Sequence, residues 1–501
     1  MNQLKAGAAL SYVLIGLNTF IGLIYTPFML RMLGQSEFGL FSLVAAVISY
    51  LTVLDLGFGN AVVRYTSKFR AEGKIEEQYS LFGMFLLIYC AISLISIIIG
   101  SYLYFNIEIL FGNSMTIEEL QRTKIMFAIM IFNLAFTFPF SLFSAIITAN
   151  ERFVFQKGLN IVRTILNPIV MVAMLYMGYR AIGMVVVITV FNVATLLIHT
   201  WYCYYKLKIR VRFKKIQWGF FKEVTIYSFW IFLNAIMDRI YWSTGQFVLG
   251  VYKGAVAVSV YAVAILLKQM FMNFSTAITS VFLPKVTAMS LMPNSEKLLS
   301  DLFIKVGRIQ YFVVGFVLSA FIVFGYHFIN MWAGQDFSDA FFITLIFFSA
   351  LLIPLIQNLG IRILQARNRM MFRSVLFIVI AVCSLFLSIL LVQQYGAIGC
   401  AVAVGLALFL GHGLIMNWYY WKKIKIDIPE FWRQIIKMSK TPVLLTLLGC
   451  LYVSYYGVNN IIEFVYKAVF FSALYILASW FLDMNHSEKE LVKSFLKFRV
   501  K

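Results

Sequence analysis

Fourteen long apolar stretches run through nearly all of this 501-residue chain, and its positive charges gather in alternate gaps between them. A helix of about 20 apolar residues spans the ~30 Å hydrocarbon core of a bilayer. The sequence therefore predicts an all-α polytopic membrane protein with an even number of spans. The predicted spans are 8–30, 37–58, 80–103, 124–147, 160–178, 183–205, 223–251, 255–282, 306–328, 340–361, 373–393, 398–420, 441–457 and 463–483.

The lysines and arginines predict the orientation of these spans. With a cytoplasmic N-terminus, 34 of the 42 Lys and Arg residues fall in cytoplasmic gaps, Arg163 among them, and six fall in outer gaps. The remaining two, Arg239 and Lys268, lie inside spans. This bias follows the positive-inside rule, so we expect both termini on the cytoplasmic side of the inner membrane. Topology thus accounts for the net charge of +21, and nucleic acid is not an expected partner.

Cysteine and histidine give no sign of a reaction centre. The five cysteines and four histidines stand singly, without the spacing of a metal site. We therefore expect no metal, no cofactor and no catalytic residues. His199 and His412 lie in spans, where a proton relay and a hydrogen-bonded packing role are both open.

The chain repeats itself at an offset of about 216 residues. Tyr179-Arg-Ala-Ile-Gly183 matches Tyr395-Gly-Ala-Ile-Gly399, and prolines 139 and 354 lie in the fourth and tenth spans. Six helices per repeat predict two lobes related by a pseudo-two-fold along the membrane normal, as in transporters built from parallel repeats. The predicted parts are an N-terminal lobe (1–215), a C-terminal lobe (216–430), helices 13 and 14 (431–483) and a cytoplasmic amphipathic tail (484–501) that begins at a capping box, Ser487–Glu490.

Four polar residues lie near the predicted midplane, in spans seven and eight. They are Asn234, Asp238, Arg239 and Lys268. Ionisable residues inside a bilayer are costly and point to function by default. We expect Asp238 to pair with Lys268, which leaves Arg239 to face a cationic cavity suited to an anionic, phosphate-bearing substrate. The alternative is a buried ion pair with a snorkelling arginine that serves only helix packing.

Three further charges are candidates for gating or ion coupling. Asp55 in span two carries a proton or cation in one interpretation and caps the cytoplasmic end of its helix in the other. Arg64 lies one turn past the end of that span. Arg31 ends span one at the outer face, where guidance of a phosphate and simple interfacial placement are both open.

Several motifs resemble a known family. Leu33-Gly-Gln-Ser-Glu-Phe-Gly-Leu-Phe-Ser42, Leu54-Asp-Leu-Gly-Phe-Gly-Asn-Ala-Val-Val-Arg64 and Asn150-Glu-Arg-Phe153 resemble the Wzx-type flippases for O-antigen and other polysaccharides. These belong to the multidrug/oligosaccharidyl-lipid/polysaccharide exporter superfamily, with the lipid II flippase and the MATE drug exporters. The resemblance implies a MATE-like fold that moves an undecaprenyl-pyrophosphate-linked oligosaccharide to the outer leaflet by alternating access. It also implies a role in polysaccharide or lipopolysaccharide biosynthesis, with other polysaccharide-assembly membrane proteins as further partners.

Two other functions compete with a flippase that binds a lipid-linked oligosaccharide and the bilayer. A multidrug or organic-cation exporter would require a negative cavity, whereas the predicted midplane carries two cations and one anion. A membrane-embedded glycan polymerase or ligase would require a large outer loop. The longest outer gap, 104–123, holds about twenty residues and one helix start at Thr116–Glu119.

Overall fold

A computed structural model of the chain describes residues 3–213, 218–279, 282–367, 369–458, 460–486 and 488–490. Every regular element in these ranges is helical. A membrane interior offers backbone groups no water, so each polar backbone group of a spanning segment finds its partner within a helix. The all-helical expectation is confirmed.

The chain divides into two compact units, Met1–Ala262 and Val263–Lys501. In the first unit the elements are α1 (Gln3–Leu51), η1 (Thr52–Asp55), α2 (Phe58–Ala71), α3 (Ile75–Phe105), α4 (Ile107–Phe111), α5 (Ile117–Ala149), α6 (Phe153–Tyr176), α7 (Arg180–Tyr205) and the first part of α8 (Trp218–Thr279). The predicted lobe boundary at residues 215 and 216 stays a prediction.

The second unit takes the end of α8 and the remaining helices. These are α9 (Leu283–Ser290), α10 (Ser295–Trp332), η2 (Gln335–Phe337), α11 (Ala340–Ile356), α12 (Leu359–Ala366), α13 (Met370–Leu408), the π-helix η3 (Phe409–Met416), α14 (Asn417–Lys422), α15 (Ile428–Tyr456) and α16 (Ile461–Leu482).

Ten helices among the described residues are long and apolar enough to cross a membrane, and α11 with α12, bent by 43°, would make an eleventh span. The chain is a multi-pass membrane protein. Three long helices are interrupted where their backbone leaves the helical region, at Gly34 in α1, Gly254 in α8 and Gly396 in α13. Each interruption lies between two predicted spans, while the count of fourteen stays a prediction.

The first two interruptions have the same conformation. Gly34 has φ 73° and ψ 178°, and Gly254 has φ 78° and ψ −172°. Glycine alone adopts this region without strain, so the chain can turn there between two consecutive apolar segments. Gly34 and Gly254 are 220 residues apart, close to the offset of the sequence repeat.

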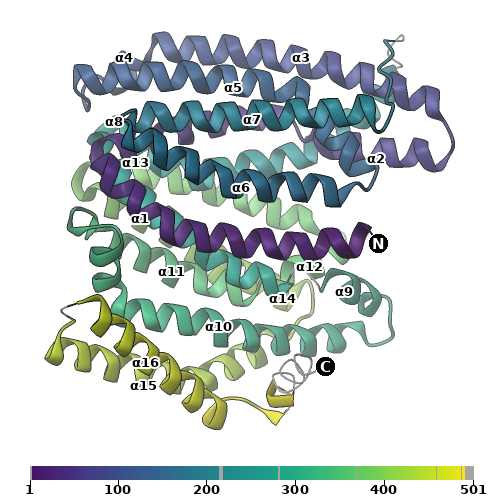
Figure 1. Cartoon of the computed structure of the whole chain (residues 1–501). Coiled ribbons are helices and arrows are strands. Elements are labelled where there is room, and N and C mark those ends of the chain that lie inside the picture. The colour runs from purple at the N-terminus through teal and green to yellow at the C-terminus, as the bar shows by residue number, and fades with distance from the viewer. Residues whose placement is uncertain are drawn as a thin grey trace. The chain divides into compact units, whose positions relative to one another are not determined.

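Within the first unit, the helices follow one another as neighbours in the order α3, α5, α7, α6 and α1 (Figure 1). Within the second unit, α10 packs against α11, α15 and α16. An apolar core of the second unit includes Phe324, Phe471 and Tyr475, and the side chain of Tyr475 is fully buried. This core joins α10 to helices that fall outside the sequence repeat.

The structure can be compared with the two capping boxes that the sequence predicts. The capping box at Thr116 and Glu119 is present, and it starts α5, a helix of 33 residues, while the short helix of the outer gap is α4. Ser487 lies outside the described residues, as does the predicted tail from 491 onwards. In the described part, Asn485 and Glu488 make reciprocal capping bonds of 3.0 and 2.9 Å instead.

Candidate functional site

The predicted midplane residues all lie on α8. Arg239 is exposed on the part of α8 that belongs to the first unit, fifteen residues, about 22 Å of helix, before Gly254. Lys268 belongs to the second unit and is buried. The side chains of Asn234 and Asp238 lie outside the described residues, so the predicted pairing of Asp238 with Lys268 stays a prediction.

Asp55 lies at a break in its helix. It ends η1, and the next two residues, Leu56 and Gly57, have φ 52° and 72° before α2 begins. A carboxylate oxygen of Asp55 and the buried hydroxyl of Tyr89 both lie within 4 Å of where a β-carbon on Gly59 would stand. Asp55 is therefore beside the N-terminal turn of α2, where a carboxylate is stabilised by the helix dipole. Arg64, further along α2, lies 5.6 Å from the ring centre of Tyr65.

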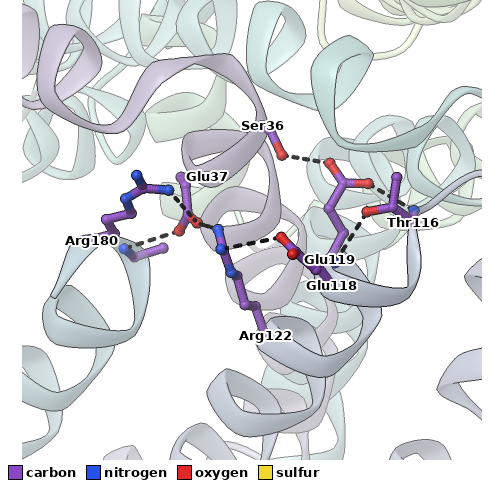
Figure 2. A network of polar contacts seen from close by, with 8 residues as sticks. Ser36, Glu37, Thr116, Glu118, Glu119, Arg122 and Arg180 are labelled. Carbon is purple, nitrogen blue, oxygen red and sulfur yellow. Dashed lines mark hydrogen bonds and ion pairs between the residues drawn. The ribbon is translucent and has the colours of Figure 1, made fainter. Parts of the chain in front are cut away.

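A cluster of charged residues ties three helices of the first unit together at the predicted outer side (Figure 2). Glu37, just after the Gly34 turn, is buried and accepts hydrogen bonds from the Arg122 guanidinium and from the backbone N–H of Ala181 at 3.2 Å. Arg180 lies 3.9 Å from the same carboxylate. The exposed Arg31 lies on α1 ahead of the same turn. Glu37 thus joins α1 to the first turns of α5 and α7.

A polar cavity of about 450 Å³ lies in the first unit, between α1 and α6. Its polar wall includes Asn18 of α1 and Asn160, Arg163 and Asn167 of α6. The charge count put Arg163 in a cytoplasmic gap, but it lies ten residues into α6, about 15 Å from the first residue of that helix. Sequence reasoning missed this group, although residues 160, 163 and 167 have the i, i+3, i+7 spacing of one helix face.

An apolar cavity of about 270 Å³ lies in the second unit. Its wall is almost entirely carbon and is rich in phenylalanine. The lining residues are Leu267, Met270, Phe271, Phe274, Phe316, Val317, Ala320, Phe321, Phe324, Gly325, Phe328, Phe348, Phe464 and Ala468. Lys268, which is buried, directly follows the first of these residues on α8. We call this cavity the apolar groove.

The buried histidine of the first unit is held in place. Nδ1 of His199 lies 2.6 Å from the Ser144 hydroxyl, and its ring meets Phe155 edge-on at 6.2 Å. These contacts favour a packing role over a proton relay. Among the described residues, no group of three His, Cys, Asp or Glu side chains could hold a metal ion.

A second buried ionic cluster closes one end of the second unit. Arg308 on α10 donates to both carboxylate oxygens of Glu488, at 2.6 and 3.0 Å, and to the backbone carbonyl of Asp483 at 3.0 Å. The Arg308 side chain is 7% exposed and that of Glu488 5%. Burial raises the pKa of the Asp483 carboxyl above its usual range. Arg308 thereby fixes the segment that follows α16 to the helix bundle.

Comparison with solved structures defines the class of the protein. The fold is similar to the lipid II flippase MurJ in its inward closed conformation, with a TM-score of 0.73, 17% identity, and coverage of 94% of this chain and 98% of MurJ. An inward-facing MATE multidrug resistance transporter of the MOP superfamily matches with a TM-score of 0.60, 15% identity and coverage of 84% and 99%. A MOP superfamily transporter from Pyrococcus furiosus matches at 0.53, with 14% identity and coverage of 86% and 97%. The chain therefore has the fold of these transporters.

The family follows from the sequence itself. The profile of the polysaccharide biosynthesis protein family matches residues 4–290, and the chain belongs to that family. No curated protein sequence matches the chain. The resemblance predicted from the motifs is confirmed at the level of the family and the superfamily fold.

Proposed function

We propose that this protein is a flippase for an undecaprenyl-pyrophosphate-linked oligosaccharide, an O-antigen or related polysaccharide unit. It moves this substrate from the cytoplasmic to the outer leaflet of the inner membrane, by alternating access through a cationic central cavity. The family supports a role in polysaccharide assembly, and the MurJ-like fold supports transport of a lipid-linked substrate.

One observation of this chain carries the proposal. In the second unit, a buried cation, Lys268, directly follows the start of a phenylalanine-rich groove. A lipid-linked pyrophosphate has the matching chemistry, a long apolar chain joined to an anionic group. The groove would offer the chain an apolar surface, and Lys268 is the cation that we propose contacts the phosphate.

The predicted site residues keep their proposed roles. Arg239 and Lys268 contact the pyrophosphate, Asp238 forms an ion pair with Lys268, and Asn234 adds a polar contact. Asp55, Arg64 and Arg31 take part in gating or ion coupling. Arg239→Ala should remove surface glycan while the protein still reaches the membrane, and Arg239→Lys should restore part of it, because an ammonium lacks the guanidinium fork.

Deletion of the gene followed by lipid analysis tests the function. Accumulation of an undecaprenyl-linked oligosaccharide in the cytoplasmic leaflet is the expected result, and restoration by the wild-type chain is the control. The likeness to MATE transporters makes multidrug export the second candidate. Normal surface glycan with increased drug sensitivity would favour that candidate and reject the flippase.

Cysteine labelling tests the orientation. With both termini cytoplasmic, cysteines placed at Arg210 and Asp427 should be shielded from an impermeant thiol reagent in intact cells. A cysteine at Asp336 should react, because its gap lies on the outer side. Labelling at 210 in intact cells would reverse the proposed direction of the spans.

A further inference from the structure

We propose that the polar cavity of the first unit, lined by Asn18, Asn160, Arg163 and Asn167, binds a sugar phosphate. Arg163 would hold the phosphate, and the three amides would hydrogen-bond to the sugar hydroxyls. This inference rests on the proposed function, because it gives the polar head of the lipid-linked substrate a second binding position, in addition to the contacts proposed for Arg239 and Lys268.

The position of Arg163 is the first argument. The residue is ten residues, about 15 Å, from the start of the 24-residue helix α6, near the middle of a helix long and apolar enough to cross a membrane. A membrane-embedded arginine faces an ion partner or a water-filled cavity, because contact with lipid tails is costly. Within the described ranges Arg163 makes no hydrogen bond and no ion pair, and it borders the cavity. A bound anion could therefore neutralise the charge of Arg163, or water could solvate it.

The asparagines supply a second, independent argument. Elsewhere in the described chain, membrane-embedded asparagines bond to protein: Asn192 donates to Asn133 and Thr137, at 2.7 Å each. Asn417 accepts from Gln357 and Trp432, at 2.8 and 2.9 Å. Buried amides are normally satisfied in this way.

The cavity asparagines differ from these. Within the part of the chain that the structure describes, the exposed Asn18 and the half-buried Asn160 and Asn167 make no side-chain hydrogen bond. The buried Oδ1 of Asn167 has no partner there. Three amides thus line the cavity from α1 and α6, beside a guanidinium that has no hydrogen-bond or ion-pair partner among the described residues. An amide offers two donors and one acceptor, which suits a polyhydroxylated ligand.

The chemistry of the wall selects the ligand class. The lining holds one cation and no carboxylate, so an organic cation would find no counter-charge. A guanidinium binds phosphate through two parallel hydrogen bonds. The volume of about 450 Å³ lies within the roughly 300–1,000 Å³ usual for small-molecule sites. Apolar residues of the same lining, such as Ile21 and Met171, can cover the C–H faces of a sugar ring.

Thiol chemistry tests the cavity directly. Asn160→Cys is made in a chain whose five native cysteines are replaced by alanine, and its reaction rates with an anionic and a cationic methanethiosulfonate reagent are compared. The anionic reagent should react faster, and Arg163→Gln in the same background should lower the rate ratio by about tenfold. Inorganic pyrophosphate should slow the labelling only when Arg163 is present. A rate ratio unchanged by Arg163→Gln, or labelling insensitive to pyrophosphate, would overturn the site.

Surface glycan in the deletion strain supplies the second readout. Arg163→Gln should abolish export, Arg163→Lys should retain part of it, and Arg152→Gln, at the exposed start of the same helix, should leave it normal. Normal export by a folded Arg163→Gln protein would reject this site while the flippase stands. Pyrophosphate could instead slow the labelling as expected while deletion of the gene leaves lipid-linked sugars unchanged. That result would reject the proposed function.

Discussion

Phe155 stacks on Tyr202 in the first unit, and Phe372 stacks on Tyr419 in the second, with ring centres 3.8 and 4.0 Å apart. Phe372 follows Phe155 by 217 residues, and Tyr419 follows Tyr202 by the same number. One cavity from each unit, the polar cavity between α1 and α6 and the apolar groove, can be compared for its chemistry. One is lined by asparagines and an arginine, the other by phenylalanines. The repeat has kept the packing at these helix ends. The repeat does not relate the polar cavity to the apolar groove, because residues of α16, outside the repeat, help to line the groove.

This difference fits an amphipathic substrate. A lipid-linked sugar phosphate needs both kinds of surface, one for its polar head and one for its chain. Duplication provides two similar scaffolds, and each can then specialise.

The buried ionic clusters of the two units can be compared through their contribution to stability. The largest loss of unfolding free energy is expected in the cluster around Arg308. Glu488→Gln leaves the buried guanidinium of Arg308 without a charged partner, so unfolding of the purified protein should become easier by ~3–5 kcal/mol. Glu430→Gln, which breaks a pair with the 78% exposed Arg433, should cost less than ~1 kcal/mol. The double variant Arg308→Met, Glu488→Met should recover most of the loss. Equal effects of the two single variants would show that Arg308 is solvated.

The cluster of the first unit should be weaker. Glu37→Gln removes a buried charge, but its partners Arg122 and Arg180 are 35% and 61% exposed and can be solvated once freed. We expect a loss of ~1.5–3 kcal/mol, the value of hydrogen bonds to charged groups. Glu118→Gln, on the same helix turn as Arg122 but exposed, is the control. A loss as large as that of Glu488→Gln would remove this distinction between the units.

The class and the repeat could be predicted because they rest on patterns of many residues. The length of the apolar stretches, the charge bias of the gaps and the matching segments at 179–183 and 395–399 are each signals that many residues of a helix or loop produce together. The turn at Gly34 falls where two predicted spans meet, because a break between apolar runs needs a residue that tolerates positive φ.

The polar cavity could not be predicted by the same means. Sorting charges by gap assigns an arginine near a span boundary to the cytoplasm, whereas Arg163 lies ten residues into the long apolar helix α6. Whether an asparagine is satisfied depends on its neighbours in space: Asn192 meets Asn133 from another helix, and Asn160 meets none in the described chain. Asn160, Arg163 and Asn167 share one face of α6, but only the packing of α1 beside it makes that face a cavity.

The apolar groove should tolerate no bulk if it holds a lipid chain. Ala320→Trp fills the groove, and we expect surface-glycan export in the deletion strain to fall by about tenfold, since overpacking costs ~1–3 kcal/mol. Ala91→Trp, at an exposed position of α3, is the matched control and should export normally. Equal export by both variants, at equal protein levels, would mean that the groove takes no part in transport.

The stacked aromatic pairs give the smallest effect and test the shared part of the two units. Phe155→Leu and Phe372→Leu each remove one stack while keeping an apolar side chain of similar length. Aromatic pairs contribute ~0.5–1.5 kcal/mol beyond the area they bury, so each variant should lose about that much stability in thermal unfolding. Because the two stacks have interplanar angles of 14° and 8° and nearly equal separations, the losses should agree within error. Tyr202→Leu and Tyr419→Leu are the reciprocal controls, and combining each with its phenylalanine variant should add little. A loss confined to one unit would mean that the repeat has diverged in its helix-end packing.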